Sequence, residues 1–387
     1  MNFVYISPHF PPNYHRFVHR LSSLGVNVLG VAEEGYDQLD PGLRASLTDY
    51  YRVDDMHSYD QMVRAVGFLT HRFGKIDRIE SLNEYWLDLE AALRNDFNVT
   101  GPKSADIINM RRKSLMKKMF LKAGVKVAQG NVVRTRKQAE NFIADVGYPV
   151  VAKPDSGVGA ADTFKISNQD ELNDFFDRKP DIDYFMEEFI EGEIFTFDGL
   201  VDQDGTPVFY TSHTYSQGIM ETVNEDSLIY YYSLREIPED LKSAGLRVLK
   251  TYGIKERLFH FEFFRSARKG EILGLEVNMR PPGGLTTDMF NFANDIDIYQ
   301  EWANVVVHNR FTASYSRPYH CCYVSRKFNK QYAHTHEEVL HSCSEKLCFH
   351  GDISGVFSAA LGNYGYLIRS PDLEEIVAMA QFIQETC

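Results

Sequence analysis

The sequence lacks any apolar run long enough to cross a bilayer and any basic segment ahead of its first apolar run. The N-terminal segment MNFVYISPHF also has no small-residue cleavage site, so it is predicted to be a core strand and not a signal peptide. Positive charge is in deficit, since 41 Lys and Arg against 54 Asp and Glu give a net charge of −13. An acidic chain is a poor general binder of nucleic acid or of an anionic membrane, although residues 110–118 form a local basic segment.

Cysteine is scarce and lies late in the chain. The five cysteines are Cys321, Cys322, Cys343, Cys348 and Cys387. An odd, clustered set gives no disulfide framework and predicts a reducing cytoplasm. The segment HSCSEKLCFH also carries His341 and His350, but the spacing of its two cysteines is wider than in the usual zinc sites. We therefore interpret it as a buried strand pair with core cysteines, in preference to a zinc site.

The first hundred residues predict a Rossmann-like sheet, but the sequence lacks the two glycine-rich motifs that commonly bind nucleotides. The first hundred residues alternate strands with helices, and strands are expected at 3–7, 26–32 and 76–81, with helices at 13–25, 59–74 and 85–97. This alternation predicts a Rossmann-like parallel sheet. The first turn, SPHFPPN, has no GxGxxG, so an NAD site is not expected there. GxxxxGK[ST] is also absent, which excludes a Walker-type loop.

The length of 387 residues exceeds what one core usually holds and predicts two or three domains. The turn-rich connector 98–106 is a candidate boundary. Beyond it the sequence predicts one long helix at 107–124 and a strand at 185–201 that is kinked at Gly192. The other expected elements are helices at 136–147, 168–178, 239–253 and 372–386 and strands at 260–265, 272–278 and 320–325. No internal repeat is present.

The loop after Lys153 is almost bare of side chains. A short apolar run at 148–152 directly precedes this lysine, and the loop at 155–161 has the sequence DSGVGAA. Glycines allow backbone amides to approach an anion closely. The pattern therefore suggests a flexible flap over the outer phosphates of a nucleotide, with Lys153 reaching inward. An ordinary hairpin with a solvent-facing lysine explains this stretch equally well.

A second segment of interest is EEFIEGE at 187–193. Its backbone and its apolar side chains could hold the edge of an adenine, and Glu193 could accept hydrogen bonds from a ribose. Taken alone, an acidic surface hairpin is the simpler interpretation.

The strongest pattern lies on two later strands. Glu276 and Asn278 are two residues apart in ILGLEVNMRPPGG, so they share one face of a strand. Glu262 in HFEFFR could complete a set of hard oxygen ligands, which suits magnesium. Arg280 lies on the same face, where it could bind a phosphate or a carboxylate. The alternative is a buried patch of paired Glu and Arg side chains.

Taken in order, these segments resemble the ATP-grasp superfamily, of the carboxylate–amine ligase type. The resemblance spans about residues 1–310. It implies an α/β and α+β chain in four parts: a Rossmann-like domain, a lid with a lysine helix and a phosphate flap, a magnesium-site subdomain, and a C-terminal α+β segment that completes the second lobe. The corresponding ranges are 1–100, 101–205, 206–310 and 311–387.

The resemblance also implies roles for individual residues. Lys113 and Lys153 look like the two ATP-phosphate lysines, although Arg112 stands where the family commonly has Asp and Lys117 is a second candidate for the first lysine. The implied phosphate flap is Ser156, Gly157, Val158, Gly159 and Ala160. The implied adenine and ribose contacts are Glu187, Glu188, Phe189, Ile190 and Glu193. The implied ligands of Mg²⁺, or of Mn²⁺, are Glu262, Glu276 and Asn278, and the acyl phosphate or carboxylate would bind Arg280.

The chemistry implied by the resemblance is ATP-dependent joining of a carboxylate to an amine through an acyl phosphate, with release of ADP and phosphate. Amino-acid and dipeptide ligases and short chains like carbamoyl phosphate synthase are the most similar types. Two alternatives stay open: a bicarbonate-activating enzyme and a nucleotide-binding regulatory protein without turnover. The expected partners are small carboxylate and amine substrates, with a homodimer left open. Residues suggested for substrate contact are His213, Tyr215, Met220, Glu221, Gly283 and Gly284.

Overall fold

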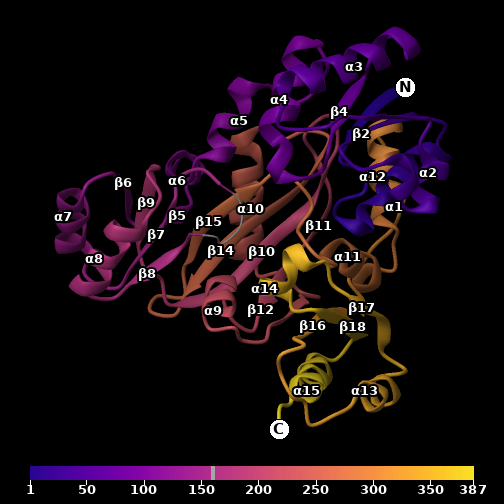
Figure 1. Cartoon of the computed structure of the whole chain (residues 1–387). Helices are drawn as coiled ribbons and strands as arrows, with labels where there is room; N and C mark the ends of the chain where they lie inside the picture. The colour runs from indigo at the N-terminus through magenta and orange to yellow at the C-terminus, as the bar shows by residue number, and fades with distance from the viewer. Residues whose placement is uncertain (158–161) are drawn as a thin grey trace.

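The computed structural model describes residues 1–157 and 162–387. Within these ranges the strands form three sheets, one parallel and four-stranded, one mixed and ten-stranded, and one antiparallel and four-stranded. Figure 1 shows the parallel sheet at the upper right, the small antiparallel sheet at the left and the C-terminal helices at the bottom. The predicted mixture of α/β and α+β architecture is confirmed.

The N-terminal domain is a parallel sheet with helices between its strands. Its strand order is β3-β2-β1-β4, and its members are β1 (Asn2–Ile6), β2 (Asn27–Ala32), β3 (Asp49–Arg52) and β4 (Arg78–Glu80). The helices are α1 (His15–Ser23), α2 (Pro41–Ser46), α3 (Tyr59–Phe73) and α4 (Leu87–Asp96). The predicted alternation is confirmed. The sequence missed β3, whose four residues are too few to give a periodic signal.

The predicted single helix at 107–124 is wrong, because the chain breaks at Arg112. Helix α5 (Ser104–Arg111) ends there, and α6 (Lys113–Lys122) begins with the next residue. Arg112 has an extended conformation, with φ −105° and ψ 120°. Its Nε donates to Asp155 Oδ2 at 2.9 Å, and the Lys113 amide donates to the Asp155 carbonyl at 2.7 Å. The break therefore fixes the start of α6 against the loop that follows Lys153.

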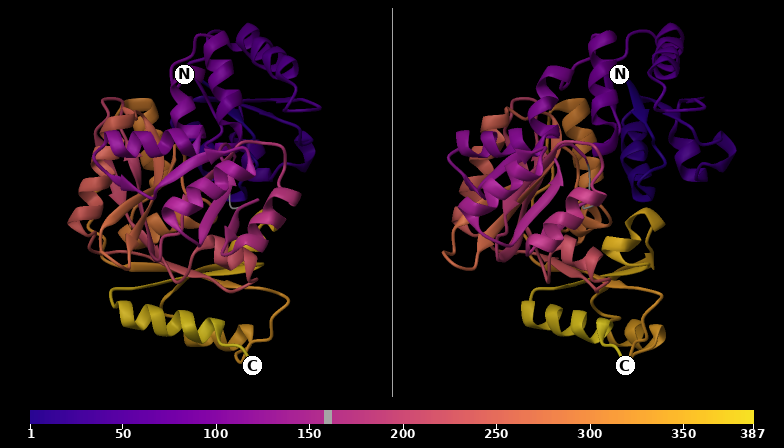
Figure 2. Two further views of the ribbon diagram at one scale, coloured as in Figure 1. Left: turned by 90° about the vertical axis from the view of Figure 1, so that its left-hand side faces the viewer. Right: turned by 60° about the vertical axis from the view of Figure 1, so that its left-hand side comes forward.

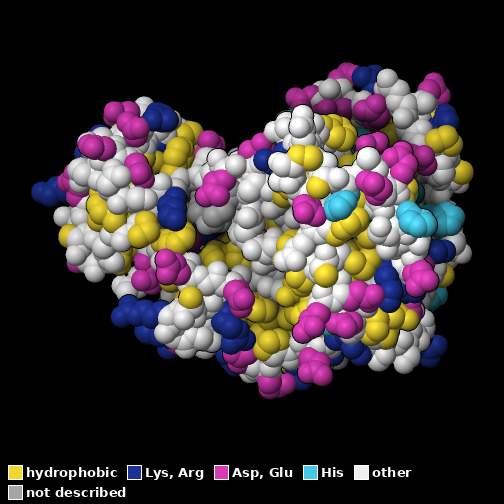
Figure 3. Space-filling view, turned by 90° about the horizontal axis from the view of Figure 1, so that it is seen from below, with side chains coloured by type: hydrophobic (Ala, Val, Ile, Leu, Met, Phe, Trp, Pro, Cys, Tyr) yellow, Lys and Arg dark blue, Asp and Glu magenta, His cyan; other side chains and the backbone are white. Residues whose placement is uncertain are grey.

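The small antiparallel sheet forms a separate lobe, which we call the lid. Its order is β6-β9-β7-β8, and its members are β6 (Gly130–Val133), β7 (Val150–Pro154), β8 (Phe164–Ile166) and β9 (Tyr184–Glu188). Helices α7 (Arg136–Val146) and α8 (Gln169–Arg178) pack on it through Phe142, Leu172 and Phe175. In the space-filling view the lid projects at the left, with a notch between it and the rest of the molecule (Figure 3).

The large sheet runs in the order β17-β18-β16-β13-β12-β10-β14-β15-β5, with β11 paired to β10. Its strands are β5 (Lys126–Val127), β10 (Gly192–Val201), β11 (Pro207–Thr211), β12 (His213–Tyr215), β13 (Tyr230–Ser233), β14 (Arg257–Ser266), β15 (Ile272–Asn278), β16 (His320–Arg326), β17 (Leu347–Asp352) and β18 (Tyr364–Ser370). The predicted single strand at 185–201 is therefore wrong, since β9 and β10 belong to different sheets. A Cβ on Gly192 would lie 2.2 Å from the Arg265 carbonyl oxygen, so only glycine fits where the chain enters the large sheet.

Because β9 and β10 belong to different sheets, the lid sheet ends earlier in the chain than the expected boundary at 205. The lid sheet stops at Glu188, and β10 is already paired along its whole length with β14. We propose a boundary at 189–191 in place of the expected 205. The boundaries at 100 and 310 remain predictions.

Most of the remaining helices pack against strands of the large sheet. The remaining helices are α9 (Ile219–Asn224), α10 (Glu239–Tyr252), α11 (Thr286–Asn294), α12 (Ile298–His308), α13 (His336–Ser342), α14 (Ser358–Leu361) and α15 (Leu373–Gln384). Figure 2 shows α13 and α15 below the sheet, on the side opposite the N-terminal domain. The C-terminal segment thus extends the large sheet by three strands and caps it with two helices.

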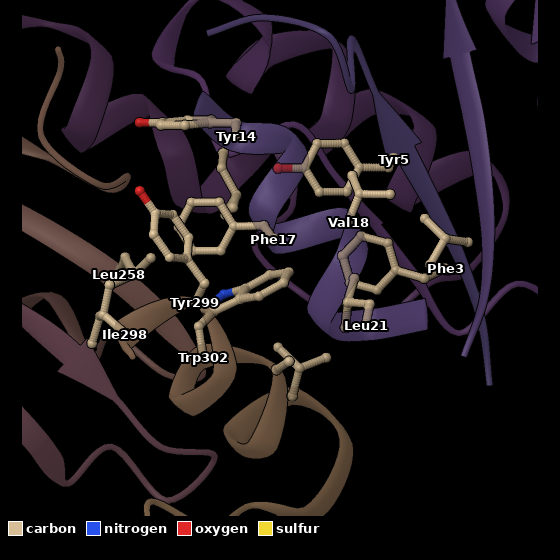
Figure 4. Packing of buried hydrophobic residues seen from close by; sticks show 14 of the residues in the cluster. Phe3, Tyr5, Tyr14, Phe17, Val18, Leu21, Leu258, Ile298, Tyr299 and Trp302 are labelled. Carbon is tan, nitrogen blue, oxygen red and sulfur yellow. The ribbon is translucent and has the colours of Figure 1, made fainter. Parts of the chain in front are cut away.

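An aromatic core joins the N-terminal domain to α12. Phe17 of α1 packs edge-on against Tyr299 and Trp302, with ring centroids 4.7 Å and 5.1 Å away (Figure 4). Two ion pairs add to this contact: Arg78 with Glu256 at 2.8 Å and Arg257 with Glu80 at 3.1 Å. Arg257 also donates to the Met279 carbonyl at 3.3 Å, and Tyr14 donates to the Pro281 carbonyl at 3.4 Å, so the carboxyl ends of β1 and β4 lie beside the loop that follows β15.

The predicted strand pair at 341–350 is wrong, because His341 lies on α13, Cys343 follows that helix, and Cys348 and His350 lie on the single strand β17. Of the late cysteines, Cys387 is exposed. Cys322 and Cys343 are buried, and His350 contacts the Tyr364 hydroxyl at 2.6 Å through Nδ1. Over residues 1–157 and 162–387, no group of three or more His, Cys, Asp and Glu side chains is arranged to hold a metal ion. In the same ranges, no helix has the length and apolarity that a bilayer crossing requires.

Candidate active site

Charged side chains are buried where α6, the lid strands and strands β14 and β15 meet. Four of these side chains are each at most 8% exposed: Lys113, Lys117, Lys153 and Glu187. Burial of so many charged groups raises the free energy of the folded protein unless the groups pair with one another or bind a charged ligand. The sequence predicted three of these as nucleotide contacts and Lys117 as an alternative, and the structure brings all four together.

Glu187 lies between two lysines. Its Oε1 is 2.5 Å from Lys153 Nζ, and its Oε2 is 2.8 Å from Lys117 Nζ. Burial by itself raises the pKa of the Glu187 carboxyl, but the two lysines outweigh burial and lower this pKa to about 2. Burial lowers the pKa of the Lys153 ammonium, but Glu187 and Glu276 together prevail and raise it. For Lys117 burial prevails, and its pKa is lowered.

Lys113 lies closer to the candidate metal residues than the other two lysines do. Its Nζ is 3.6 Å from Glu276 Oε1 and donates to the Gly157 carbonyl at 3.3 Å. Lys117 Nζ instead donates to the Gly274 carbonyl at 3.1 Å, in addition to its pairing with Glu187. Lys113 therefore links the start of the flap to the acidic strand, whereas Lys117 anchors Glu187.

Glu262 and Glu276 face each other across strands β14 and β15. The register pairs Glu262 with Glu276 and His260 with Asn278, so all four side chains lie on one face of the sheet. The two glutamates are each 25% exposed, in contrast to the fully covered core around them. Two carboxylates and one amide oxygen are hard donors, and Glu276 has only Lys113 as a salt-bridge partner within the described residues. This donor set fits a magnesium ion.

A buried acidic residue on the same face, one strand further along the sheet, was not predicted from the sequence. Asp198 on β10 is fully buried and accepts hydrogen bonds from Thr196 Oγ1 at 2.5 Å, His213 Nδ1 at 2.8 Å and His260 Nδ1 at 2.6 Å. The other ring nitrogen of His260 contacts Glu262 Oε1 at 3.1 Å. Burial by itself raises the pKa of Asp198, but His260 and His213 outweigh burial and lower it to about 2. The chain Asp198–His260–Glu262 thus orients one of the candidate metal ligands.

The predicted adenine and ribose contacts lie at the hinge between the lid and the large sheet. Glu188 Oε1 accepts from the Gln129 amide at 2.9 Å, and the ring of Phe189 lies 4.0 Å from Lys165 Nζ. Ile190 is half-buried, and Glu193 is exposed on β10 opposite Arg265. Their roles toward a nucleotide remain predictions.

The predicted flap is described only in part. Ser156 and Gly157 are exposed, and Ser156 forms a bridge with Arg112. Val158, Gly159 and Ala160 lie outside the described residues. Arg112, which departs from the family pattern, therefore holds the base of the predicted flap through Asp155 and Ser156.

Arg280 and the PPGG segment end the acidic strand β15. Arg280 is half-buried and donates from Nη1 to the Pro281 carbonyl at 2.9 Å. Gly284 has a left-handed φ of +62°, and a Cβ there would lie 2.5 Å from Leu361 Cδ1. Its carbonyl accepts from Asn13 Nδ2 at 3.2 Å, so the N-terminal domain contacts this segment directly. Gly283 has open space where its Cβ would be.

The residues at 213–221 that were suggested for substrate contact lie on a strand and a helix. His213 lies fully buried on β12 and bonds Asp198, and Tyr215 stacks on Tyr231 with centroids 5.0 Å apart. Met220 and Glu221 lie on α9, and their side chains fall outside the description. His213 therefore lies buried in the large sheet beside Asp198 and not at the surface.

Comparisons with known proteins agree with this geometry. Residues 146–288 match the model of the ATP-grasp domain family, so the chain contains an ATP-grasp domain, as the resemblance predicted. These residues include Lys153, Glu187, Glu262, Glu276 and Asn278.

Two curated proteins and one solved structure show what else the chain is similar to. It is 24% identical over 267 residues to the L-arginine-specific L-amino acid ligase of Bacillus subtilis, which covers 67% of this chain and 64% of that protein. It is 20% identical over 194 residues to the C-terminal section of the carbamoyl phosphate synthase large chain of Aquifex aeolicus, covering 48% of this chain and 35% of that one. The chain thus spans less than two thirds of either curated relative. The crystal structure of an L-amino acid ligase from Bacillus licheniformis has the same fold, with a TM-score of 0.74, 17% identity, and coverage of 98% of this chain and 96% of that one.

Proposed function

We propose that the protein is an ATP-dependent carboxylate–amine ligase that forms ADP and phosphate. The observation that carries the proposal is the placement of two buried lysines, Lys113 and Lys153, beside the acidic pair Glu262 and Glu276 inside an ATP-grasp domain. Cations on one side and hard acidic ligands on the other suit the phosphates of Mg·ATP. The similarity to L-amino acid ligases supports this choice among ATP-grasp activities.

In this proposal each charged residue has one task during phosphoryl transfer. Lys153 and Lys113 donate to the ATP phosphates and hold them in line with the substrate carboxylate. Glu262, Glu276 and Asn278 would hold Mg²⁺, which neutralises charge on the phosphate oxygens. Arg280 binds the substrate carboxylate and then the acyl phosphate.

Glu187 has a supporting task in the same scheme. It stays ionised between Lys117 and Lys153 and keeps the Lys153 ammonium aimed across the junction. A carboxylate oxygen attacks the γ-phosphorus of ATP, and ADP leaves with the electron pair of the broken P–O bond. The neutral amine substrate then attacks the acyl carbon, its proton passes to solvent, and phosphate leaves with the electron pair of the broken C–O bond.

The proposed function is tested by measuring ADP and phosphate release with ATP and Mg²⁺ in the presence of the twenty amino acids and a set of small carboxylates. Release that depends on both a carboxylate and an amine, with an amide product seen by mass spectrometry, supports the ligase. Release with bicarbonate as the sole carboxylate would favour the bicarbonate-activating alternative. Nucleotide binding without release under any condition would favour the regulatory alternative. A cytoplasmic location and a homodimer remain predictions.

A further inference from the structure

Asp155 is a buried carboxylate that takes no part in the proposed chemistry. It directly follows strand β7, two residues after Lys153, and it is 1% exposed. A charged side chain is rarely buried to this extent without several hydrogen-bond partners. The partners of Asp155 therefore indicate what its burial stabilises.

Both carboxylate oxygens of Asp155 accept hydrogen bonds from the start of helix α6. Oδ1 accepts from the Ser114 amide at 2.8 Å, and Oδ2 accepts from Ser114 Oγ at 3.0 Å and from Arg112 Nε at 2.9 Å. The Asp155 carbonyl accepts from the Lys113 amide at 2.7 Å. One residue thus contacts three consecutive residues at the start of α6, which fixes both its direction and its distance from the helix.

The contact with Ser114 supplies a cap that helix α6 lacks. The first amides of an α-helix have no partner within the helix, and the side chain just before the helix commonly supplies one. Arg112 occupies this N-cap position, and its side chain makes no cap hydrogen bond. Asp155 provides the acceptor from another part of the chain, and its negative charge suits the positive end of the helix dipole. The first turn of α6, which carries Lys113, is therefore held by the segment that carries Lys153.

The two lysines belong to separate lobes, so this contact connects the lobes. Helix α6 packs on the large sheet, where Phe120 lies edge-on against Phe263 with ring centroids 5.8 Å apart. Strand β7 belongs to the lid sheet and contributes to the lid core with α7 and α8. Asp155 therefore joins the lid to the large sheet. It lies two residues along the chain from Lys153 and one backbone hydrogen bond from Lys113.

We propose that Asp155 is a positioning residue that sets Lys113 and Lys153 at the spacing that the phosphates of ATP require. Each lysine is carried by its own lobe, and a shift of about 1 Å in a positioned group can cost about 10²-fold in rate. Asp155 limits such a shift, because it holds the backbone of α6 against the end of β7. This inference rests on the proposed function, since it takes both lysines to bind ATP phosphates.

The test compares a ligand that carries phosphates with one that carries none. Binding of a non-hydrolysable ATP analogue with Mg²⁺ is measured by calorimetry on the full chain, and binding of adenosine is measured by competition. The variants are Asp155→Ala, Asp155→Asn and Ser114→Ala, with Asp183→Ala as the matched control. Asp183 also pairs with Arg112, at 3.3 Å, but it pairs with Arg134 as well, and its side chain is 32% exposed. The kcat/KM for ATP and the melting temperature are measured for each variant.

We expect Asp155→Ala to weaken binding of the analogue about 10-fold and that of adenosine less than about 3-fold, since adenosine offers no phosphate to either lysine. The kcat/KM for ATP should fall about 100-fold, because misplaced donors cost most in the transition state. Asp155→Asn keeps an acceptor for the Ser114 amide and should lose less. Ser114→Ala removes only the hydroxyl donor and should lose least. Asp183→Ala should keep both affinities within about 2-fold, as expected for an exposed ion pair.

Equal weakening of the analogue and adenosine by Asp155→Ala would show that Asp155 only stabilises the fold, and it would overturn the inference. Unchanged binding of the analogue, or an equal loss in Asp183→Ala, would overturn it as well. If Asp155→Ala does not fold, the same comparison is made with Asp155→Asn, which keeps the shape of the side chain.

Turnover separates this inference from the proposed function. If the wild type releases no ADP with any carboxylate and amine, while Asp155→Ala selectively weakens binding of the ATP analogue, the ligase proposal fails and the positioning role stands. If the wild type makes amides and Asp155→Ala makes them with an unchanged kcat/KM for ATP, the ligase proposal stands and the positioning role fails.

Discussion

Glu262 on β14 and Glu276 on β15 are direct cross-strand partners on one face of the large sheet. Two carboxylates placed opposite each other repel, and they are tolerated only where cations compensate them. Here His260 contacts Glu262 and Lys113 approaches Glu276. An arrangement of this kind is what a divalent cation site requires, and it makes the two glutamates testable as a pair.

The first prediction concerns these two glutamates. Glu276→Gln and Glu262→Gln should each cripple ADP formation much more than they weaken nucleotide binding, because ligands of a catalytic metal matter most where charge develops in the transition state. Asn278→Ala should cost less, since water can replace a neutral ligand. The measurement is the magnesium dependence of ADP formation, with thermal stability recorded for the same three variants. A normal magnesium dependence combined with a large loss of stability would show that the glutamates are structural ion-pair partners.

The second prediction concerns Lys153. Lys153→Ala should lower the rate of ADP formation at least ~100-fold while the fold persists, because a positioned donor to a transferring phosphoryl group is worth about 10²–10³ in rate. Lys137→Ala is the control, since Lys137 is an exposed lysine on α7 of the same lobe. Initial rates at saturating ATP and far-ultraviolet circular dichroism are compared for both variants. Normal turnover by Lys153→Ala would show that the lysine only balances the charge of Glu187.

Many residues of this site could be predicted from the sequence because the patterns that identify them lie within a few neighbouring residues. The two-residue periodicity of a strand is enough to place Glu276 and Asn278 on one face, and the bare loop after Lys153 is visible in the sequence itself. The helix and strand ends that the sequence predicted wrongly are set by contacts with residues far along the chain. Arg112 ends α5 because of Asp155, and β10 leaves the lid because it pairs with β14.

Residues that act through partners far along the chain could not be found in this way. Asp198 reaches His260 only because β10 and β14 are neighbours in the sheet, with those two residues in register.

The third prediction concerns the contact between the N-terminal domain and the large sheet. Arg257 is buried between Glu80 and Glu90, with nitrogen–oxygen distances of 3.1 Å and 3.6 Å. Arg257→Met should destabilise the protein by about 3–5 kcal/mol, because it removes one of the two arginines, Arg257 and Arg94, that pair with these buried carboxylates. The exposed pair of Arg64 with Asp60 is the control, and Arg64→Met should cost less than about 0.5 kcal/mol. Urea unfolding of both variants measures the difference, and equal midpoints would contradict a buried role for Arg257.

The last prediction concerns the pH dependence of stability that comes from Asp198. The pKa of this buried carboxyl is lowered to about 2 in the folded protein, by His260 and His213 acting against burial. A group whose pKa is lower in the folded state stabilises the fold above its unfolded pKa, and that contribution is lost as the pH falls toward the folded value. Asp198 should therefore stabilise the protein fully at pH 5 and progressively less between about pH 4 and pH 2.

The variant Asp198→Asn keeps the shape of the side chain and removes its charge. Its melting temperature should lie well below that of the wild type at pH 5, because His260 loses its anionic partner. The difference should shrink steadily as the pH is lowered from 4 toward 2, where the wild-type carboxyl also takes up a proton. Asp202→Asn is the comparison, since Asp202 lies just beyond the end of the same strand, where its side chain accepts hydrogen bonds from the loop amides of Asp204 and Thr206. Calorimetry of the three proteins between pH 5 and pH 2.5 tests this. A difference between the wild type and Asp198→Asn that stays constant over this range would show that Asp198 is not the ionised partner of His260.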